Sequence, residues 1–185
     1  MALMRSLIIA APVVVIRAAR ADELDAARTV MLDAFAPVVP ADRDATPAVR
    51  DAFARHRADL ADVRSRLGRA DLLVADEGGQ VAGAVTLFRP AAAEAPWPGG
   101  WASIRFLAVD PARRGRGIGR ALTAACIEGA RQHGAPVLAL HTTRDQPVAR
   151  AMYLRMGWVR APSYDLWPLP QLHVEAFVLD LMSST

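Results

Sequence analysis

FLAVDPARRGRGIGRAL, residues 106–122, is the stretch that decides the fold. Its apolar beginning predicts the end of a buried strand, Asp110-Pro111 predicts a stop, and the residues from Gly117 onward predict a helix. Glycines let a backbone turn sharply and come close to a ligand. Free N–H groups at a helix N-terminus favour an anion such as pyrophosphate. The stretch therefore predicts a strand, a phosphate-binding loop and a helix, with nearby arginines adding positive charge.

Three kinds of phosphate-binding loop can be compared with this stretch. A P-loop needs Gly-Lys-Ser/Thr after its glycines, but Gly119 is followed by Arg120. A dinucleotide fingerprint needs G-x-G-x-x-G, and Arg120 stands where the third glycine should follow Gly115 and Gly117. The pattern that fits is Arg-x-x-Gly-x-Gly, formed by Arg114, Gly117 and Gly119. The plain alternative is a strand-to-helix turn in a basic protein.

Hydrophobic periodicity and turn residues predict strands and helices on both sides of this stretch. The expected strands are Val13–Arg17, Asp71–Asp76, Gln80–Phe88, Trp101–Val109, Pro136–His141, a return strand from Trp158, and His173–Leu181. The expected helices are Asp22–Phe35, a helix from Thr46-Pro47 to Leu67, Gly117–His133 and Asp145–Met156. The proline-rich segments Arg89–Gly100 and Pro162–Leu172 are expected to be loops.

A second motif lies downstream and reads Ala149-Arg-Ala-Met-Tyr153-Leu-Arg-Met-Gly157-Trp158. It resembles the Ala-x-x-Leu-Tyr-x-x-x-Gly-Phe signature of the GCN5-related N-acetyltransferase (GNAT) superfamily, with Met152 for Leu and Trp158 for Phe. The first stretch is similar to the coenzyme A loop of the same superfamily, and the two motifs are separated as they are there. The resemblance covers residues 13–181 in element order, whereas the specific motifs occupy only residues 106–122 and 149–158.

The resemblance implies an α/β (α+β) GNAT fold. Such a fold has a central, twisted, mostly antiparallel sheet of about seven strands with about four flanking helices. Its fourth and fifth strands, by analogy Trp101–Val109 and Pro136–His141, splay apart. We expect residues 13–185 to form a single domain after a lead-in of residues 1–12; a signal-peptide core at Leu7–Ile16 is the alternative. The resemblance also allows a homodimer through the last strands.

Acetyl-CoA is the acyl donor that the resemblance implies. Its pantetheine arm would enter the gap between the splayed strands, and its pyrophosphate would rest on the N–H groups of the loop. An N–H group near Leu107 would polarise the thioester carbonyl. The cofactor-binding residues implied in this way are Leu107, Ala108, Val109, Arg114, Gly115, Arg116, Gly117, Ile118, Gly119 and Arg120.

Tyr153 is, by analogy, the group that gives a proton to the departing thiolate. A phenol has an ordinary pKa of about 10 and therefore keeps its proton at neutral pH. Tyr153 also lies on the apolar face of its helix, so a core role is the alternative, and both roles can hold together. The general base stays open because Ser103 stands where many relatives carry Glu. A water chain, His141 and Glu94 are the candidates.

The composition narrows the class of protein. The formal net charge is only +3, and all 22 basic residues are Arg, as in GC-rich bacterial genomes. The arginines are spread along the chain, so we expect no nucleic-acid partner. The single cysteine, Cys126, forms no intrachain disulfide and fits the cytoplasm. We expect no membrane span and no metal, because no apolar stretch is long enough and the histidines lack ligand spacing.

Three functions follow from these patterns. The first is an enzyme, an acetyl-CoA-dependent N-acetyltransferase acting on an amine of an unidentified small molecule or peptide. The second is a non-catalytic acyl-CoA-binding or sensing domain, which Ser103 favours and Tyr153 opposes. The third is a nucleic-acid-binding protein that uses the arginines of the loop, and it predicts strongly salt-dependent binding.

Overall fold

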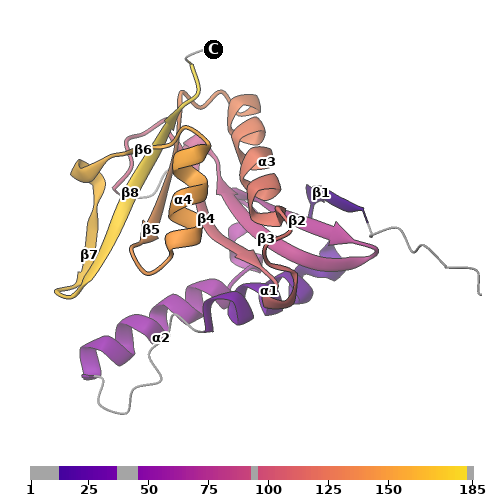
Figure 1. Ribbon diagram of the computed structural model, residues 1–185, viewed down its shortest axis with the longest axis horizontal. Coiled ribbons are helices and arrows are strands. Elements are labelled where there is room, and N and C mark those ends of the chain that lie inside the picture. Colours follow the sequence, from indigo (N-terminus) through magenta and orange to yellow (C-terminus); the bar gives the residue numbers. More distant parts are fainter. Residues whose placement is uncertain (1–12, 37–45, 93–95, 183–185) are drawn as a thin grey trace, which may run out of the picture.

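The computed structural model describes residues 13–36, 46–92 and 96–182 (Figure 1). Four α-helices are found in these residues: α1 (Leu24–Phe35), α2 (Pro47–Ala61), α3 (Ile118–Gln132) and α4 (Pro147–Arg155). The strands are β1 (Val14–Ala18), β2 (Ala70–Glu77), β3 (Gln80–Phe88), β4 (Ala102–Val109), β5 (Val137–Thr143), β6 (Val159–Arg160), β7 (Leu166–Leu169) and β8 (Leu172–Asp180). The expected lead-in, residues 1–12, lies outside the described residues.

Local chemistry explains where several elements begin and turn. The carboxylate of Glu23 accepts a hydrogen bond from the Arg20 N–H at 2.8 Å, just before α1. Thr46 caps α2 by accepting from the Val49 N–H, ahead of a proline at the first helical position. The β2–β3 hairpin turns at Gly78 and Gly79, both with positive φ, as a two-residue hairpin turn requires.

The eight strands form one sheet in the order β1-β2-β3-β4-β5-β8-β6, and β7 pairs with β8 on the same edge as β6. All neighbouring strands are antiparallel except β4 and β5, which run parallel. The mostly antiparallel α/β fold and its fourth and fifth strands are therefore confirmed. β4 and β5 pair over only three residues, from Ala102 opposite Leu138 to Ile104 opposite Leu140.

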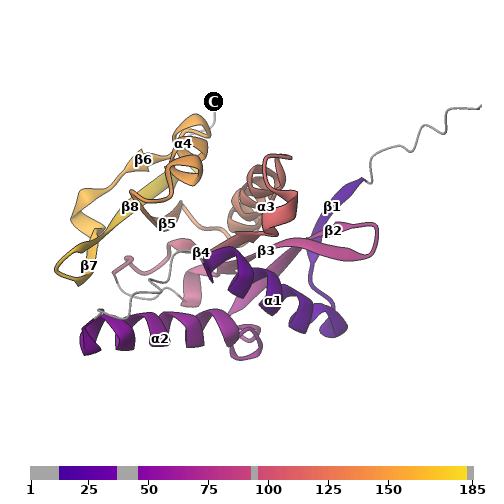
Figure 2. The ribbon, with the colours of Figure 1, turned by 60° about the horizontal axis from the view of Figure 1, so that its bottom comes forward.

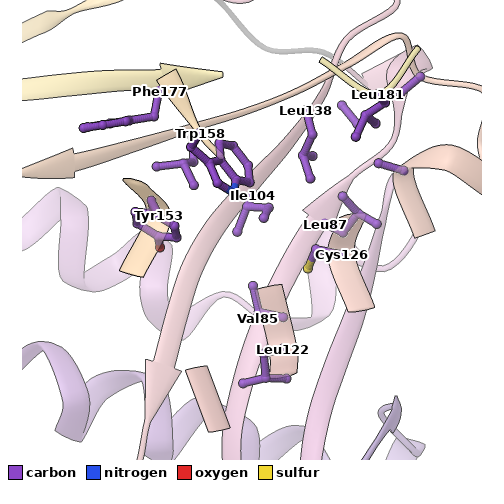
Figure 3. Packing of buried hydrophobic residues seen from close by; sticks show 14 of the residues in the cluster. Val85, Leu87, Ile104, Leu122, Cys126, Leu138, Tyr153, Trp158, Phe177 and Leu181 are labelled. Atoms are coloured by element: carbon purple, nitrogen blue, oxygen red, sulfur yellow. The ribbon is translucent and has the colours of Figure 1, made fainter. Parts of the chain in front are cut away.

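Helices cover both faces of the sheet (Figure 2). α3 and α4 lie on one face, and their buried side chains join those of β3, β4, β5 and β8 in the main core around Leu122, Leu138 and Phe177 (Figure 3). α1 and α2 lie on the other face and pack around Met31, Leu60 and other buried residues. These two surfaces are called the α3/α4 face and the α1/α2 face below.

Two of the predicted boundaries were wrong. The segment Pro162–Leu172 was expected to be a loop, but it contains a 3-10 turn at Pro162–Tyr164 and the strand β7, which pairs with β8. Pairing with a distant strand supplies hydrogen bonds that local sequence does not reveal. The second helix ends at Ala61 rather than Leu67, because the Asp62 carboxylate accepts hydrogen bonds from the Ser65 N–H and hydroxyl and supports a separate 3-10 turn.

Neither a membrane-crossing helix nor a metal-binding cluster is found in the described residues. The helices there are too short or too polar to cross a membrane. No three histidine, cysteine, aspartate or glutamate side chains in the same ranges gather as metal ligands would.

Candidate active site

The first feature of the site is an irregular strand. Phe106 has φ of 58°, a left-handed conformation that is strained for a side chain of this size. The register between β3 and β4 shifts at the same place, from Arg105 opposite Thr86 to Ala108 opposite Ala84, which marks a β-bulge. The pairing of β4 with β5 has already stopped at Ile104. The bulge therefore coincides with the separation of the two strands, and the last five residues of β4 have no ladder partner in β5.

This free strand edge contains three of the predicted cofactor-binding residues. Leu107 and Val109 are half-buried against the core of the α3/α4 face, whereas Ala108 is buried on the α1/α2 face. Their backbone is paired with β3 on one side only, through Ala108 and Val109. An unpaired strand edge can take up an extended molecule that carries amide groups, by adding to the ladder.

The second feature is the loop that enters α3. Gly115 and Gly117 have φ of 78° and 80°, so both positions favour glycine. Gly117 is the N-cap residue of α3, and no side-chain cap hydrogen bond is found at this helix start among the described residues. A Cβ added at Gly115 or Gly117 would meet nothing within 4 Å. The first N–H groups of α3, including those of Ile118 and Gly119, thus follow two glycines with open space around them, an arrangement that suits an anion.

The four arginines of the loop differ in their partners. Arg113 and Arg116 both bind the carboxylate of Glu77, and Arg113 also binds Asp110 at 2.7 Å. Arg114 is exposed, and its guanidinium donates to the carbonyl of Ala34 at 3.0 Å. Arg120 is exposed and has no ion-pair partner in the part of the chain that the structure describes. The positive charge expected from Arg116 is therefore largely compensated, while Arg114 and Arg120 keep theirs.

The second sequence motif lies beside the first in space. A Cβ built on Gly119 would lie 3.6 Å from Cγ2 of Val109 and 3.8 Å from Sδ of Met152, which is ordinary van der Waals contact. Met152 immediately precedes Tyr153 in α4. The glycine at the start of α3, the free end of β4 and the inner face of α4 are thus brought together on the α3/α4 face.

Tyr153 is buried on this face, with 5% of its surface exposed. Its ring packs against Trp158 and Phe177 at centroid distances of 5.7 and 6.5 Å (Figure 3). Burial raises the pKa of the phenol well above its usual value. Tyr153 is therefore part of the core and holds its proton throughout the neutral range, while its role as proton donor to the thiolate stays a prediction.

His141 lies on the opposite face of the sheet. It alternates on β5 with Leu138 and Leu140, which point into the main core, so its ring faces the α1/α2 side. The ring stacks on Trp97 at 4.4 Å, and Nε2 lies 2.9 Å from the backbone carbonyl oxygen of Tyr164. Because a carbonyl can only accept, Nε2 must carry the proton, and the neutral ring then has its acceptor at Nδ1.

The surroundings of His141 favour this neutral form. Burial lowers the pKa of the imidazole below its ordinary value, and nearby Arg105 lowers it further, while the contact with Tyr164 and the charge of Asp165 oppose the shift. The imidazole is thus uncharged at neutral pH, with a proton on Nε2 and a free acceptor at Nδ1. Trp97, Trp101 and Tyr164 pack together beside it with ring centroids 5.3 to 6.2 Å apart.

Ser103, which stands where many relatives carry Glu, and Glu94, the other candidate side chain, add nothing to the case for a general base. Ser103 is buried on β4, 3% exposed, and pairs with Ala139 across the three-residue ladder to β5. Its hydroxyl remains too weakly basic to act alone. Glu94 lies outside the described residues.

Cys126 and the remaining histidines have structural surroundings. Cys126 is fully buried, and burial raises the pKa of its thiol well above the usual range, so it does not form a reactive thiolate. His133 lies 2.6 Å from Asp71, and His173 lies 2.7 Å from Asp165. His56 is half-buried between the rings of Phe35 and Phe106.

Sequence reasoning missed two contributors to the site. Glu77, at the end of β2, was not singled out, although it holds two arginines of the loop. Tyr164 was assigned to a loop, but its backbone carbonyl fixes the tautomer of His141. Both act across 23 to 39 residues of sequence, so no local pattern signals them.

Comparison with known proteins agrees with this geometry. The sequence pattern of the Acetyltransferase (GNAT) family matches residues 35–158. Mycothiol acetyltransferase of Cellulomonas flavigena is 36% identical in an alignment of 121 residues that covers 59% of this chain and 35% of that protein. The chain therefore spans about a third of the length of that curated relative.

Solved structures show the same fold at low sequence identity. A GNAT-family acetyltransferase of Staphylococcus aureus Mu50 superposes with a TM-score of 0.68 at 16% identity, covering 91% of this chain and 99% of that one. YncA of Salmonella typhimurium, a putative acetyltransferase solved with acetyl-CoA, gives a TM-score of 0.65 at 19% identity, covering 94% and 96%. With both motifs, the splayed strands and the family match in agreement, the chain belongs to the acetyltransferase (GNAT) family.

Proposed function

We propose that this protein is an N-acetyltransferase that transfers an acetyl group from acetyl-CoA to an amine. The observation that carries the proposal is the arrangement of three groups on one face: the uncapped N-terminus of α3, the free edge of β4, and the buried phenol of Tyr153. The family membership and the acetyl-CoA bound to a protein of the same fold support this choice of donor.

The residues present fit an acyl-CoA. The space above Gly115 and Gly117 is open, and the uncapped N–H groups from Gly117 to Gly119 suit a pyrophosphate. Arg114 and Arg120 are exposed beside them. The unpaired edge of β4 from Leu107 to Val109 suits the amide groups of a pantetheine arm, so that the thioester would reach the bulge at Phe106.

The protein then contributes to transfer in three ways. A backbone N–H beside the bulge, near Leu107, donates to the thioester oxygen as negative charge develops there. On the α3/α4 face, Tyr153 gives its proton to the sulfur as the C–S bond breaks. On the α1/α2 face, Nδ1 of His141 accepts a proton from the attacking amine, directly or through water, as the C–N bond forms. The products are an N-acetyl amide and a free thiol.

The two faces of the sheet thereby have different roles in this proposal. The donor occupies the α3/α4 face and the amine approaches from the α1/α2 face, so the reacting groups meet in the gap between β4 and β5. This arrangement supports direct transfer without a covalent enzyme intermediate. The inert surroundings of Cys126 agree with it.

The curated relative is named mycothiol acetyltransferase, and the match to this chain covers only about a third of that protein. The acceptor of that protein is therefore not carried over. The α1/α2 face combines aromatic rings at Trp97, Trp101 and Tyr164 with the charged groups of Arg105 and Asp59. We propose a small molecule or peptide amine as the acceptor.

The test is calorimetric titration of acetyl-CoA into the wild-type protein, a Gly117→Asp variant and a Gly134→Asp control. Gly134 ends α3 with φ of 71° and open space around it, so the control introduces the same residue and a similar backbone strain at the other end of the helix. We expect a Kd of about 1–100 μM for the wild type and the control, within the usual range for enzyme substrates, and loss of binding in Gly117→Asp.

A screen of amines with detection of free thiol follows from binding. Amine-dependent thiol release would support the enzyme, whereas binding without release by any amine would favour a sensor. If the folded wild-type protein did not bind acetyl-CoA, the proposal would be overturned.

A further inference from the structure

Glu77 is a buried carboxylate that the proposed mechanism does not use. It is the last residue of β2, at the turn into β3, where side chains are ordinarily solvated. Only 7% of its surface is exposed. Buried carboxylates are rare unless they are paired, so the partners of Glu77 show what it is for.

Its partners are two arginines of the loop that leads into α3. Oε2 forms an ion pair with Nε of Arg113 at 2.9 Å and accepts a hydrogen bond from Nη1 of Arg116 at 3.2 Å, and Oε1 accepts from Nη2 of Arg116. Arg113 and Arg116 stand on either side of Arg114 and Gly115. One carboxylate therefore holds both ends of a four-residue arc, 113–116, from a strand that is 36 residues or more away in sequence.

Residues 113–116 need an anchor of this kind to keep one conformation. The arc is largely exposed, and its glycine, Gly115, has a positive φ, as does Gly117 immediately after it. Added Cβ atoms at these glycines would touch nothing, so packing does not hold them in place. A loop of this kind loses much conformational entropy when it becomes ordered around a ligand. Ordering it beforehand removes that cost from binding.

We propose that Glu77 is a positioning residue for the acyl-CoA phosphates. It acts through Arg113 and Arg116 to hold the loop in the conformation that presents the N–H groups of α3 to the anion. This inference rests on the proposed function, since it concerns the same site. In this proposal Arg116 stabilises the loop and does not contact the phosphates. Arg114, Arg120 and the backbone N–H groups make the direct contacts with the phosphates.

The proposal makes a prediction whose sign is opposite to that of simple electrostatics. Glu77→Gln removes a negative charge near an anion site, so electrostatics alone would tighten the binding of acetyl-CoA. If Glu77 positions the loop, the same variant weakens binding. We expect a Kd for acetyl-CoA raised about tenfold or more, because charge-assisted contacts from a buried carboxylate are lost.

Asp71→Asn is the matched control. Asp71 lies on the same strand at the end remote from the loop and also binds two basic groups, Arg89 and His133, at 2.6 Å each. Its variant loses a comparable carboxylate without touching residues 113–116, so acetyl-CoA should bind as in the wild type. Hydrogen exchange in the absence of acetyl-CoA gives a second readout: amides of residues 113–118 should exchange faster in Glu77→Gln and unchanged in Asp71→Asn.

A double-mutant cycle with Arg116→Ala separates positioning from direct contact, and hydrogen exchange of residues 113–118 in the Arg116→Ala variant alone serves if Glu77→Gln folds poorly. If Arg116 acts through Glu77, the double variant binds acetyl-CoA about as weakly as either single variant. If Arg116 contacts the phosphates itself, the two losses add, and the inference is wrong. Unchanged or tighter binding by Glu77→Gln overturns it as well. Failure of the wild type to bind acetyl-CoA would instead overturn the proposed function.

Discussion

The two faces of the sheet are built in different ways. On the α3/α4 face, two short motifs supply almost every group of the candidate site, and the positive φ values of Gly115 and Gly117 already set the shape of the loop. On the α1/α2 face, His141, Trp97 and Tyr164 come from separate segments and meet only in the folded protein. The proposed donor side thus comes mostly from two local motifs, with Glu77 as its distant contributor, whereas the proposed acceptor side comes entirely from separate segments.

This difference indicates where the specificity for the acceptor can change. The groups proposed to hold an acyl-CoA are mostly backbone N–H and C=O groups, whose positions depend on the glycines, the bulge and Glu77. The proposed acceptor side consists of side chains outside the loop. One family can therefore keep one donor and vary its acceptors.

The largest expected effect is at Tyr153 and tests whether the donor side carries the chemistry. Tyr153→Phe keeps the ring in its contacts with Trp158 and Phe177 but removes the proton donor. We expect kcat to fall by about 10²–10³-fold, with little change in the KM for acetyl-CoA, as measured by thiol release.

Tyr164→Phe is the control for this variant, because Tyr164 is the only other tyrosine in the chain and lies on the α1/α2 side. Its backbone carbonyl, which contacts His141, is retained. A kcat in Tyr153→Phe equal to that of the wild type would limit Tyr153 to its role in the core.

The next effect concerns the acceptor side. Replacing His141 by Gln should lower the rate at pH 7 by about 10–10²-fold if the imidazole accepts the proton of the amine. Since burial lowers the pKa of His141, the wild-type rate should fall only when the pH drops below the ordinary histidine value of about 6.5. The variant should lose this acidic limb of the pH–rate profile.

His173→Gln provides the comparison, since His173 also stacks on a tryptophan and contacts a carboxylate, that of Asp165. It should leave the acidic limb in place. If His141→Gln lowers the rate equally at every pH, His141 serves packing only and the base lies elsewhere.

The smallest effect is expected at the exposed charge of the loop. Arg120→Ala removes a guanidinium that has no ion-pair partner in the described ranges, and it should weaken acetyl-CoA binding by about fivefold or less. Binding should also become less sensitive to salt. Arg131→Ala, near the other end of α3, is the control, and equal affinities for the two variants would remove Arg120 from the site.

Much of the fold followed from sequence because its signals are local. Helix caps, the Gly78-Gly79 turn and hydrophobic periodicity placed most helices and strands to within a few residues. The exceptions were β7, which forms only because β8 offers a hydrogen-bonding partner, and the end of α2, where Asp62 competes for the backbone. Strand pairing between distant segments leaves little trace in the segment itself.

The sequence by itself indicated the family, the glycine-rich turn into α3 and the place of Tyr153 on the apolar face of its helix, because glycine conformations and helix periodicity are properties of consecutive residues. Only the tertiary structure decided which arginines of the loop keep their charge, that Glu77 ties two of them, and which nitrogen of His141 carries a proton. These properties depend on burial and on partners contributed by other segments, and a side chain acquires both only when the chain has folded.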